Sequence, residues 1–318
     1  MSTERAPHQT LARDEGRHTP GDEALWNESY YADFVDQAGQ LAGYVRLGLY
    51  PNLGVSWWTA MVVGPERPVV ASVAYDLAVP ADPGLAVGGP GFATALEAPE
   101  PLERFTVVAE TTTEVFDHPA QAYQGGGRPG TLALDLAWGS DGTPYHYDVT
   151  TRYELPCQVE GSVVVDGTAY QVAGPGQRDH SWGVRDWWAS SWCWLALRLD
   201  DGTRVHAVAV RGSSWPLGYL QEGPWPGPGK VADLRALSIT EDLGEAGLPT
   251  AARVELEAAG DDGERRSLVL VVEPLAFGPL LLTAPDGRQS RFPRAQARFT
   301  APDGRTGLGW IEWNQPPA

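Results

Sequence analysis

Cysteine and positive charge are both scarce in this sequence, and each shortage excludes a class of protein. Only Cys157 and Cys193 occur in 318 residues, which is too few for a disulfide framework, and their spacing is not that of metal ligands. They fit a reducing compartment, although the sequence also permits one disulfide bridge between them. The 23 basic side chains face 41 acidic ones, giving a net charge of -18. Because such a surface repels phosphate backbones and anionic lipid, nucleic acids and membrane surfaces are poor partners.

Long apolar segments are also missing. The most apolar stretch, residues 268–282, is interrupted by a glutamate, a glycine and two prolines, so no membrane span is expected. Residues 1–21 are polar and charged and lack the apolar core of a signal peptide, which predicts a disordered lead-in and a cytoplasmic protein. A hydrophobic fraction of 42% nevertheless supports a sizeable core, and the remaining length suits two domains.

Turn residues and alternating hydrophobicity predict an all-β protein. The chain has 37 glycines and 27 prolines, which favour turns and disfavour long helices; short helices are expected only at 24–35 and 231–237. Residues 105–115 and 145–155 alternate between hydrophobic and polar side chains, as strands with one buried face do. Asp-Gly pairs suit the positive φ angles of tight hairpin turns, and six occur, at residues 141–142, 166–167, 201–202, 262–263, 286–287 and 303–304.

A Gly-Pro-Gly sequence at 174–176 suggests a domain boundary. Before it, a hairpin around residues 166–167 closes one series of expected strands, and after it an aromatic-rich series runs to the C-terminus. Each series has the size of one antiparallel barrel or sandwich. We therefore expect a lead-in at 1–21 and two barrel-like β domains at 22–173 and 174–318.

Candidate functional residues gather at the start of the second predicted domain. Tryptophan usually buries its ring while its N–H finds a partner, and a charge among such rings is either paired or functional, because an uncompensated buried charge is costly. Pairing between the arginines and aspartates of residues 178–186 in a domain interface explains these charges as well as a functional site does. Five of the 13 tryptophans fall within residues 182–194, as Trp182, Trp187, Trp188, Trp192 and Trp194.

Strand geometry separates the two most polar candidates of this segment. In a regular strand, Asp179 faces one side and His180 the other. The two could share a cavity only if a β-bulge interrupted the alternation. We therefore expect one of them to be catalytic and the other to be supporting.

The sequence Asp179-His180-Ser181-Trp182-Gly183 resembles the Asp-His-x-Trp-Gly signature of a family of paired lipocalin-like domains. That family includes hydroxyneurosporene synthase, which is the carotenoid 1,2-hydratase, as well as kievitone hydratase and the AttH-like proteins. Residues 26–31, 43–48 and 307–313 resemble one actinobacterial-type branch of it. The resemblance implies two lipocalin-like (calycin-like) β halves, a ligand cavity near their junction, and no metal or organic cofactor.

The resemblance also implies an activity on small apolar molecules. Hydratases of the family add water to a carbon–carbon double bond of an isoprenoid or prenyl group, and other relatives are cyclases or pericyclases. His180 and Trp182 correspond to the His-x-Trp pair of the carotenoid hydratases. Their Tyr-x-Asp pair, one strand later, has no acidic counterpart in residues 204–210, so the proton donor would differ here.

Protonation of an alkene needs an acid in a dry, aromatic pocket. A desolvated indole face stabilises a cation by about 2 kcal/mol or more, and an apolar pocket keeps a carboxyl group neutral by raising its pKa. Asp179 is the first candidate for the acid, with His180 as the base or water-orienting group. Glu312 is a second acid, unless it faces water from an edge strand. The expected substrate-binding residues are Trp182, Trp187, Trp188, Arg185, Tyr30 and Trp310.

The sequence therefore predicts a cofactor-independent hydratase or dehydratase that acts on an isoprenoid-like substrate. Two alternatives stay open: a cyclase or isomerase that uses the same acid, and a non-catalytic carrier of lipids or terpenoids. His118, His146, His180 and His206 are scattered, so no metal site is expected. No phosphate loop, serine nucleophile elbow or Cys/His pairing supports nucleotide or hydrolase chemistry.

Overall fold

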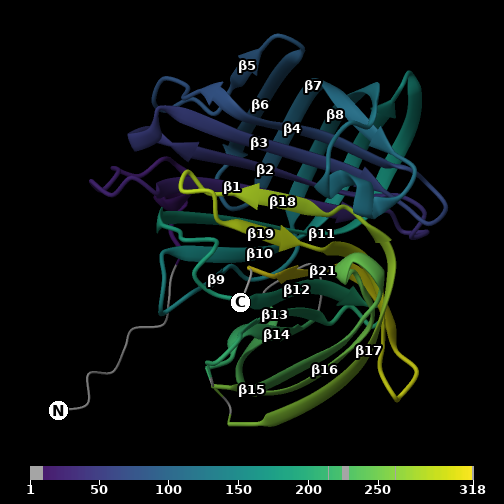
Figure 1. The fold of residues 1–318 in the computed structure, drawn as a ribbon. Coiled ribbons are helices and arrows are strands. Elements are labelled where there is room, and N and C mark those ends of the chain that lie inside the picture. Colours follow the sequence, from purple (N-terminus) through teal and green to yellow (C-terminus); the bar gives the residue numbers. More distant parts are fainter. Residues whose placement is uncertain (1–9, 214, 224–228, 262, 317–318) are drawn as a thin grey trace.

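The first half of the chain folds into a ring of strands (Figure 1). The computed structural model describes residues 10–213, 215–223, 229–261 and 263–316. Eight antiparallel strands follow the order β4-β3-β2-β1-β11-β10-β8-β7, and pairing of β4 with β7 closes the ring, while β5, β6 and β9 extend it. The strands are β1 (Trp26–Val35), β2 (Ala42–Tyr50), β3 (Val55–Val63), β4 (Val69–Ala78), β5 (Val87–Gly89), β6 (Phe92–Glu100), β7 (Arg104–Phe116), β8 (Arg128–Ser140), β9 (Tyr145–His146), β10 (Arg152–Val165) and β11 (Thr168–Val184).

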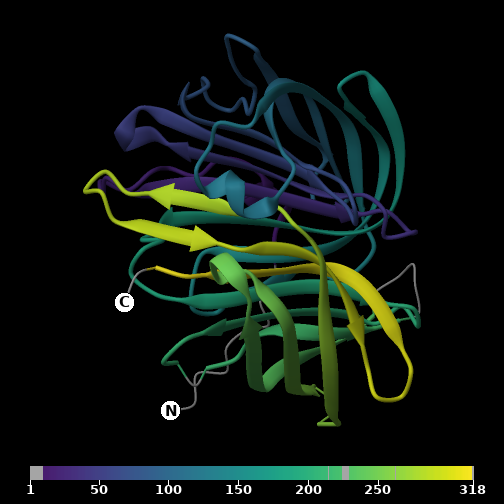
Figure 2. The ribbon, with the colours of Figure 1, turned by 45° about the vertical axis from the view of Figure 1, so that its right-hand side comes forward.

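The second half forms a closed eight-stranded antiparallel barrel. Its order β12-β13-β14-β15-β16-β17-β20-β21 closes through pairing of β12 with β21. The remaining strands, β18 and β19, form a hairpin that leaves this barrel and lies along the side of the first one (Figure 2). The strands are β12 (Trp192–Leu199), β13 (Arg204–Val210), β14 (Leu217–Glu222), β15 (Lys230–Leu243), β16 (Pro249–Gly260), β17 (Arg265–Phe277), β18 (Leu280–Thr283), β19 (Gln289–Phe292), β20 (Arg294–Thr300) and β21 (Thr306–Asn314).

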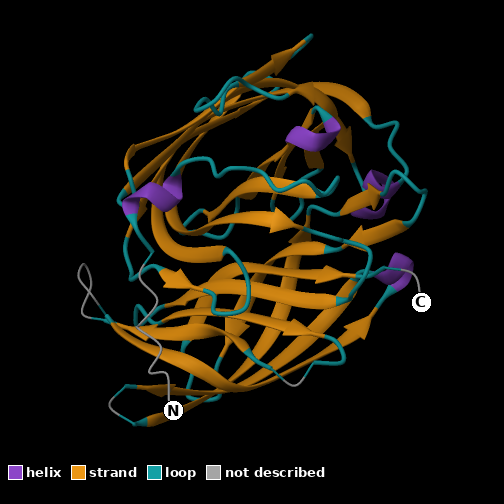
Figure 3. Ribbon diagram, turned by 90° about the vertical axis from the view of Figure 1, so that its left-hand side faces the viewer, coloured by secondary structure: helices purple, strands orange, loops and turns teal. Residues whose placement is uncertain are grey.

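The all-β prediction is confirmed, and the helices within the described ranges are short 3-10 turns (Figure 3). Of the segments expected as short helices, residues 26–35 form β1 and residues 231–237 lie in β15, while residues 24 and 25 are in a turn. Every side chain of β1 is buried, because one face points into the first barrel and the other towards the second, so the alternation that marks a strand is absent. No helix in the described part of the chain has the length and apolar character to cross a membrane. The 3-10 turns are η1 (Ala12–Glu15), η2 (Pro51–Leu53), η3 (Pro119–Tyr123) and η4 (Glu245–Gly247).

One of the two predicted alternating strands is confirmed and the other is wrong. In β7 the side chain of Phe105 is buried, whereas those of Glu110 and Glu114 are exposed. Residues 145–155 form two strands rather than one, because β9 ends at residue 146 and β10 begins at residue 152. These strands pair with each other, so the alternating pattern runs through a hairpin and its connecting bend.

The Asp-Gly pairs lie where the turn chemistry predicts them. Five of the six fall between consecutive strands, and Asp262 of the remaining pair lies outside the described residues. Asp166 and Gly167 have φ angles of 47° and 79°, and positive values at both central residues match the twist of the flanking strands. This turn pairs Val165 with Thr168 and so fixes the register of the long β10–β11 hairpin.

Gly174 lies inside β11 rather than at a domain boundary. β11 pairs with β10 and β1 of the first barrel, and the chain enters the second barrel only at Trp192. A β-carbon on Gly174 would lie 2.1 Å from the carbonyl oxygen of Val35, so glycine here permits close contact between strands rather than a linker. By sheet membership, the division falls between Val184 and Trp192, and the Asp-His-x-Trp-Gly motif belongs to the first barrel.

Residues 10–21 pack into the end of the first barrel, which corrects the prediction of a disordered lead-in; residues 1–9 lie outside the described part. The η1 turn carries Glu15 inside, where Arg178 Nη1 donates a hydrogen bond to its carboxylate at 2.6 Å and the Tyr153 hydroxyl donates another. His18 stacks on Trp182 with ring centroids 3.7 Å apart. This polar segment can dock because its buried charge meets an opposite charge, which composition alone does not reveal.

Buried hydrophobic side chains form four groups, one of which lies between the β18–β19 hairpin, the connecting segment and the first barrel. Two others fill the interiors of the barrels. The remaining group joins their outer faces, with Tyr31, Tyr44 and Met61 of the first barrel packed near Trp194 and Trp310 of the second. Aromatic rings dominate this contact and bury large apolar areas, so the two barrels present one shared core layer to each other.

Replacing Glu15 with alanine should lower the free energy of unfolding by about 3–5 kcal/mol, because it leaves the Arg178 guanidinium buried without its carboxylate. Urea unfolding followed by tryptophan fluorescence measures the change. Arg13→Ala, on the exposed side of the same turn, is the matched control and should change the free energy by about 0.5 kcal/mol or less. Equal effects of the two substitutions would show that the lead-in does not stabilise the barrel.

Candidate functional site

A cavity of about 220 Å³ lies between the two barrels. Strands β1, β2, β10 and β11 supply its wall on one side, and β12, β13, β20 and β21 supply the other. The segment that links the barrels adds Trp187, which joins Trp192 and Trp194 in an aromatic wall. The cavity is also charged, because it is lined by Arg46, Arg152, Arg185 and Arg294 together with Asp179, Asp186 and Glu312.

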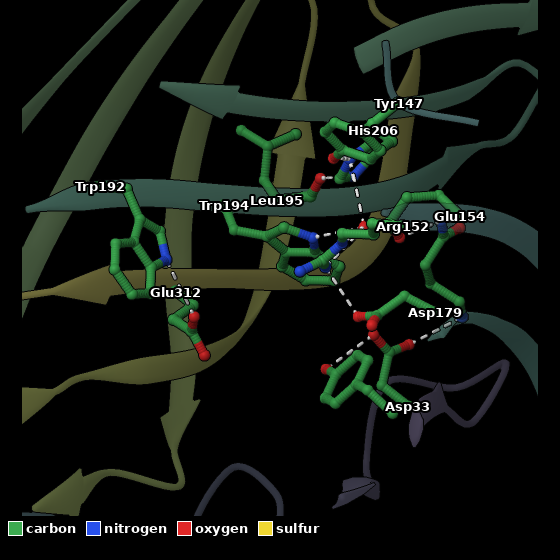
Figure 4. Close-up of polar contacts among 12 residues, drawn as sticks. Asp33, Tyr147, Arg152, Glu154, Asp179, Trp192, Trp194, Leu195, His206 and Glu312 are labelled. Carbon is green, nitrogen blue, oxygen red and sulfur yellow. Dashed lines mark hydrogen bonds and ion pairs between the residues drawn. The ribbon is translucent and has the colours of Figure 1, made fainter. Parts of the chain in front are cut away.

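Asp179 lies on the cavity wall in an ion pair (Figure 4). Its side chain is 7% exposed, and Arg152 Nη2 donates a hydrogen bond to its Oδ2 at 2.7 Å. Burial raises the pKa of Asp179 to about 6, although the Arg152 guanidinium opposes this shift. A carboxyl group with such a pKa exchanges its proton near neutral pH, as general acid–base catalysis requires.

Glu154 is the buried centre of the polar contacts behind Asp179. Arg152 Nε donates a hydrogen bond to its Oε1 at 2.8 Å, and Trp194 Nε1 donates another at 3.1 Å. The side-chain amide of Gln177 donates to the other carboxylate oxygen at 2.8 Å. Since Glu154 has no exposed surface, these donors compensate its charge and fix Arg152 in position.

Tyr147 and His206 form a second polar pair at the cavity. His206 Nδ1 donates a hydrogen bond to the Leu195 carbonyl at 3.0 Å, so its Nε2 accepts the hydroxyl proton of Tyr147. Burial and the nearby Arg152 lower the pKa of His206 well below its ordinary value, which keeps the ring neutral. Burial raises the pKa of Tyr147 well above its ordinary value. The cavity therefore has a neutral phenol held by a neutral imidazole.

The sequence does not identify Tyr147, Arg152, Glu154 and His206 as a group. Arg152 and Glu154 lie on the polar side of the alternating pattern at 145–155, which predicts exposure to water. In the structure that side faces the second barrel instead. The signal that could have identified them is the adjacency of tyrosine, arginine and glutamate in a hairpin that leads into the strand before the motif.

His180 lies on the opposite face of β11, inside the end of the first barrel. Its Nε2 is 2.7 Å from Glu28 Oε1, and its Nδ1 is 2.7 Å from the Asp14 carbonyl oxygen. Tyr30 stacks on its ring at 4.1 Å. The register between β1 and β11 is regular through this segment, so no bulge brings His180 to the cavity. Tyr30, Trp182 and His180 are thus together, but away from Asp179.

Glu28 bridges two histidines at this position. His18 Nδ1 lies 2.8 Å from the Oε1 atom of Glu28 that also contacts His180. Burial, the largest single effect, raises the pKa of Glu28, but the hydrogen bonds with the two histidine rings together outweigh it, so the pKa is lowered. One ligand atom from each residue lies within 4.8 Å of the others, which is a spacing that could hold a metal ion. The hydrogen bonds already made there account for all three side chains without one.

Besides Asp179, three predicted residues line the cavity: Arg185, Trp187 and Glu312. Glu312 does not face water from an edge strand, because β21 pairs on both sides and its carboxylate forms an ion pair with Arg294. Trp188 and Trp310 are buried in hydrophobic clusters and are not part of the cavity wall. Their indole N–H groups donate to the Leu282 carbonyl and to the Phe34 carbonyl, both at 3.1 Å.

The sequence matches the family model DUF7064, described as a domain of unknown function, over residues 11–317. The chain belongs to the DUF7064 family. No curated protein matches this DUF7064 sequence.

Solved structures share the fold of this DUF7064 chain at low sequence identity. The proposed AttH protein NE1406 of Nitrosomonas europaea is 15% identical, with a TM-score of 0.60 over 97% of this chain and 99% of that one. Kievitone hydratase from Nectria haematococca is 12% identical, with a TM-score of 0.58 over 92% and 90% of the two chains. CghA bound to Sch210972 is 13% identical, with a TM-score of 0.57 over 92% and 89%. These likenesses confirm the paired all-β fold that the motif implies.

The buried carboxyl group of Asp33 links the stability of the protein to pH. It accepts hydrogen bonds from the Tyr31 hydroxyl and the Gln177 backbone N–H, both at 2.9 Å, and burial raises its pKa to about 8. A folded-state pKa above the unfolded value of about 3.9 means that the folded protein holds the proton more tightly. The stability from this group is therefore present at low pH and lost as pH rises towards 8.

Asp33→Asn should remove this loss, so the free energy of unfolding of the variant should improve relative to the parent protein between pH 5 and pH 8. The gain should approach about 1.4 kcal/mol per pH unit at most. Urea unfolding at four pH values measures it, with Asp135→Asn on the exposed face of β8 as the control. A constant difference across this pH range would show that Asp33 is ionised throughout.

Proposed function

We propose that the cavity between the barrels is the active site of a hydratase or dehydratase that acts on a carbon–carbon double bond by acid–base catalysis. The observation that carries this proposal is Asp179, a buried carboxyl group with a raised pKa at the wall of an indole-lined cavity. The kievitone hydratase and CghA folds support it, because they are the same paired architecture. At this low sequence identity the two folds support the location of the site between two barrels and do not indicate the substrate.

In the hydration direction, protonated Asp179 transfers its proton to one alkene carbon. The other carbon becomes a tertiary cation, which the faces of Trp187, Trp192 and Trp194 can stabilise. Arg152 stabilises the Asp179 carboxylate that remains. A water molecule then attacks the cation and returns one proton to Asp179, so the acid is regenerated and the net change is addition of water. Dehydration is the reverse sequence.

His180 has a positioning role in this proposal instead of the role of the base. Its ring faces away from the cavity and contacts Glu28 and the backbone of Asp14. It therefore holds β1 and the lead-in against β11 and keeps Asp179 directed to the other side. Trp182 and Tyr30 pack around it and share this role.

Asp179→Asn should lower turnover by about 100-fold or more, because the amide cannot donate the proton that a general acid supplies. The assay incubates prenylated phenols and linear terpenoid alkenes in water labelled with oxygen-18 and detects products by mass spectrometry. Glu160→Gln, at an exposed position on β10, should keep full turnover. Unchanged turnover in Asp179→Asn would refute the role of this acid.

The isotope also separates the alternative reactions. Incorporation of oxygen-18 identifies hydration. A rearranged product without the label identifies a cyclase or isomerase, which would use the same acid and quench the cation within the substrate. A compound that binds and is recovered unchanged identifies a carrier.

Turnover should fall as pH rises above about 6, because the acid must be protonated to react and the folded-state pKa of Asp179 is about 6. Above that value the rate should drop about tenfold per pH unit. His180→Gln should lower stability yet leave this limb of the pH–rate profile in place. If the pH at which the rate begins to fall shifts in His180→Gln but not in conservative cavity variants, His180 is the acid–base group.

A further inference from the structure

Two of the four arginines that line the cavity lack an ion-pair partner. Among the described residues, no carboxylate lies within 4.0 Å of the guanidinium group of Arg46 or Arg185. Arg185 Nη1 donates a hydrogen bond to Thr150 Oγ1 at 2.8 Å, whereas its buried Nη2 has no hydrogen-bond partner. Arg46 lies over the ring of Trp187 at 5.0 Å, and its contact with the Tyr50 hydroxyl is long, at 3.4 Å.

The acidic groups of the cavity are already bound to other arginines. Asp179 accepts from Arg152, and Glu312 pairs with Arg294. The third acid, Asp186, lies 3.4 Å from an arginine outside the cavity wall. Even partial burial of a charge without a partner is costly. The half-buried Arg46 and Arg185 are therefore two uncompensated cations at one site of a protein whose net charge is -18.

A cavity with surplus guanidinium groups is also a poor place for a carbocation alone. The Trp faces favour the cation, but Arg46, Arg152, Arg185 and Arg294 repel it. A ligand that brings its own negative charge removes this conflict, since it neutralises the arginines and attracts the developing positive charge. The same ligand would hold the proton on Asp179 more tightly, because a nearby anion disfavours the carboxylate.

We infer that the cavity binds an unsaturated small molecule bearing a carboxylate or a similar planar anion, and that Arg185 and Arg46 bind this group while the tryptophans hold the apolar body. The inference rests on the proposed function and names its substrate class. Guanidinium groups match planar carboxylates through parallel N–H bonds, and the unpartnered Nη2 of Arg185 is one such donor. A neutral isoprenoid would leave both arginines without a negatively charged partner.

The test compares acids with their own alcohols, so that the carbon skeleton is held constant. Geranic, cinnamic and benzoic acids and the three matching alcohols are titrated into the full chain at pH 7.5 by isothermal titration calorimetry. At least one acid should bind about ten- to a hundred-fold more tightly than its alcohol, which is the range for a hydrogen bond between charged groups. If no acid binds more tightly than its alcohol, the inference is wrong.

Substitutions locate the anion. Arg185→Met should remove most of the preference for acid over alcohol and leave affinity for the alcohol within about twofold, because methionine keeps the apolar stem and loses the charge. Arg185→Lys should keep part of the preference, and Arg46→Met should lower it as well. Arg253→Met, an exposed position on β16, is the matched control and should leave it intact. A preference that survives Arg185→Met and Arg46→Met together would overturn the assignment.

These binding measurements require no turnover, so they test the anion site independently of the proposed reaction. Asp179→Asn should keep the preference for acids even though it loses catalysis. A preference for acids without any product in labelled water would support the anion site and refute the hydratase. Hydrated product formed equally from acids and alcohols would support the hydratase and refute the anion site.

Discussion

Alternation along β11 places neighbouring side chains in different compartments, and the site depends on this constraint. β11 pairs in regular register with β1 and β10. Asp179 and Ser181 therefore face the cavity between the barrels, while His180 and Trp182 face the interior of the first barrel. One short motif carries out two tasks: its cavity side supplies an acid, and its barrel side anchors the lead-in. A single bulge would mix the two sets and disturb both.

The charge on the cavity side is held by a network that crosses between the barrels (Figure 4). Arg152 of β10 contacts both Asp179 and Glu154, and Glu154 accepts a hydrogen bond from Trp194 of the second barrel. Because Glu154 is fully buried, these partners must stay in place for its charge to be tolerated. The orientation of the two barrels and the environment of Asp179 are thus stabilised by the same contacts.

Local features of the sequence predict the all-β class, the Asp-Gly turns and the opposite orientations of Asp179 and His180, because each depends on residues next to one another. Features that depend on distant contacts were not predictable. Glu15 is a polar residue in a polar segment until Arg178, on another strand, gives it a partner. The glycine at 174 resembles a linker until its contact with β1 is known. The alternating pattern predicts exposure of the polar residues at 152 and 154, because it does not show that a second barrel covers them.

Each barrel core is packed with its own side chains, and the cavity of the proposed site lies outside both cores, where the connecting segment lines it and the β18–β19 hairpin packs behind that segment. Trp187 comes from that segment and contacts Phe292 of the hairpin. Insertions or deletions in these two connections could change the size of the guest without repacking either core. The architecture therefore separates the parts that determine folding from those that select a ligand, which leaves selectivity free to diverge on an unchanged scaffold.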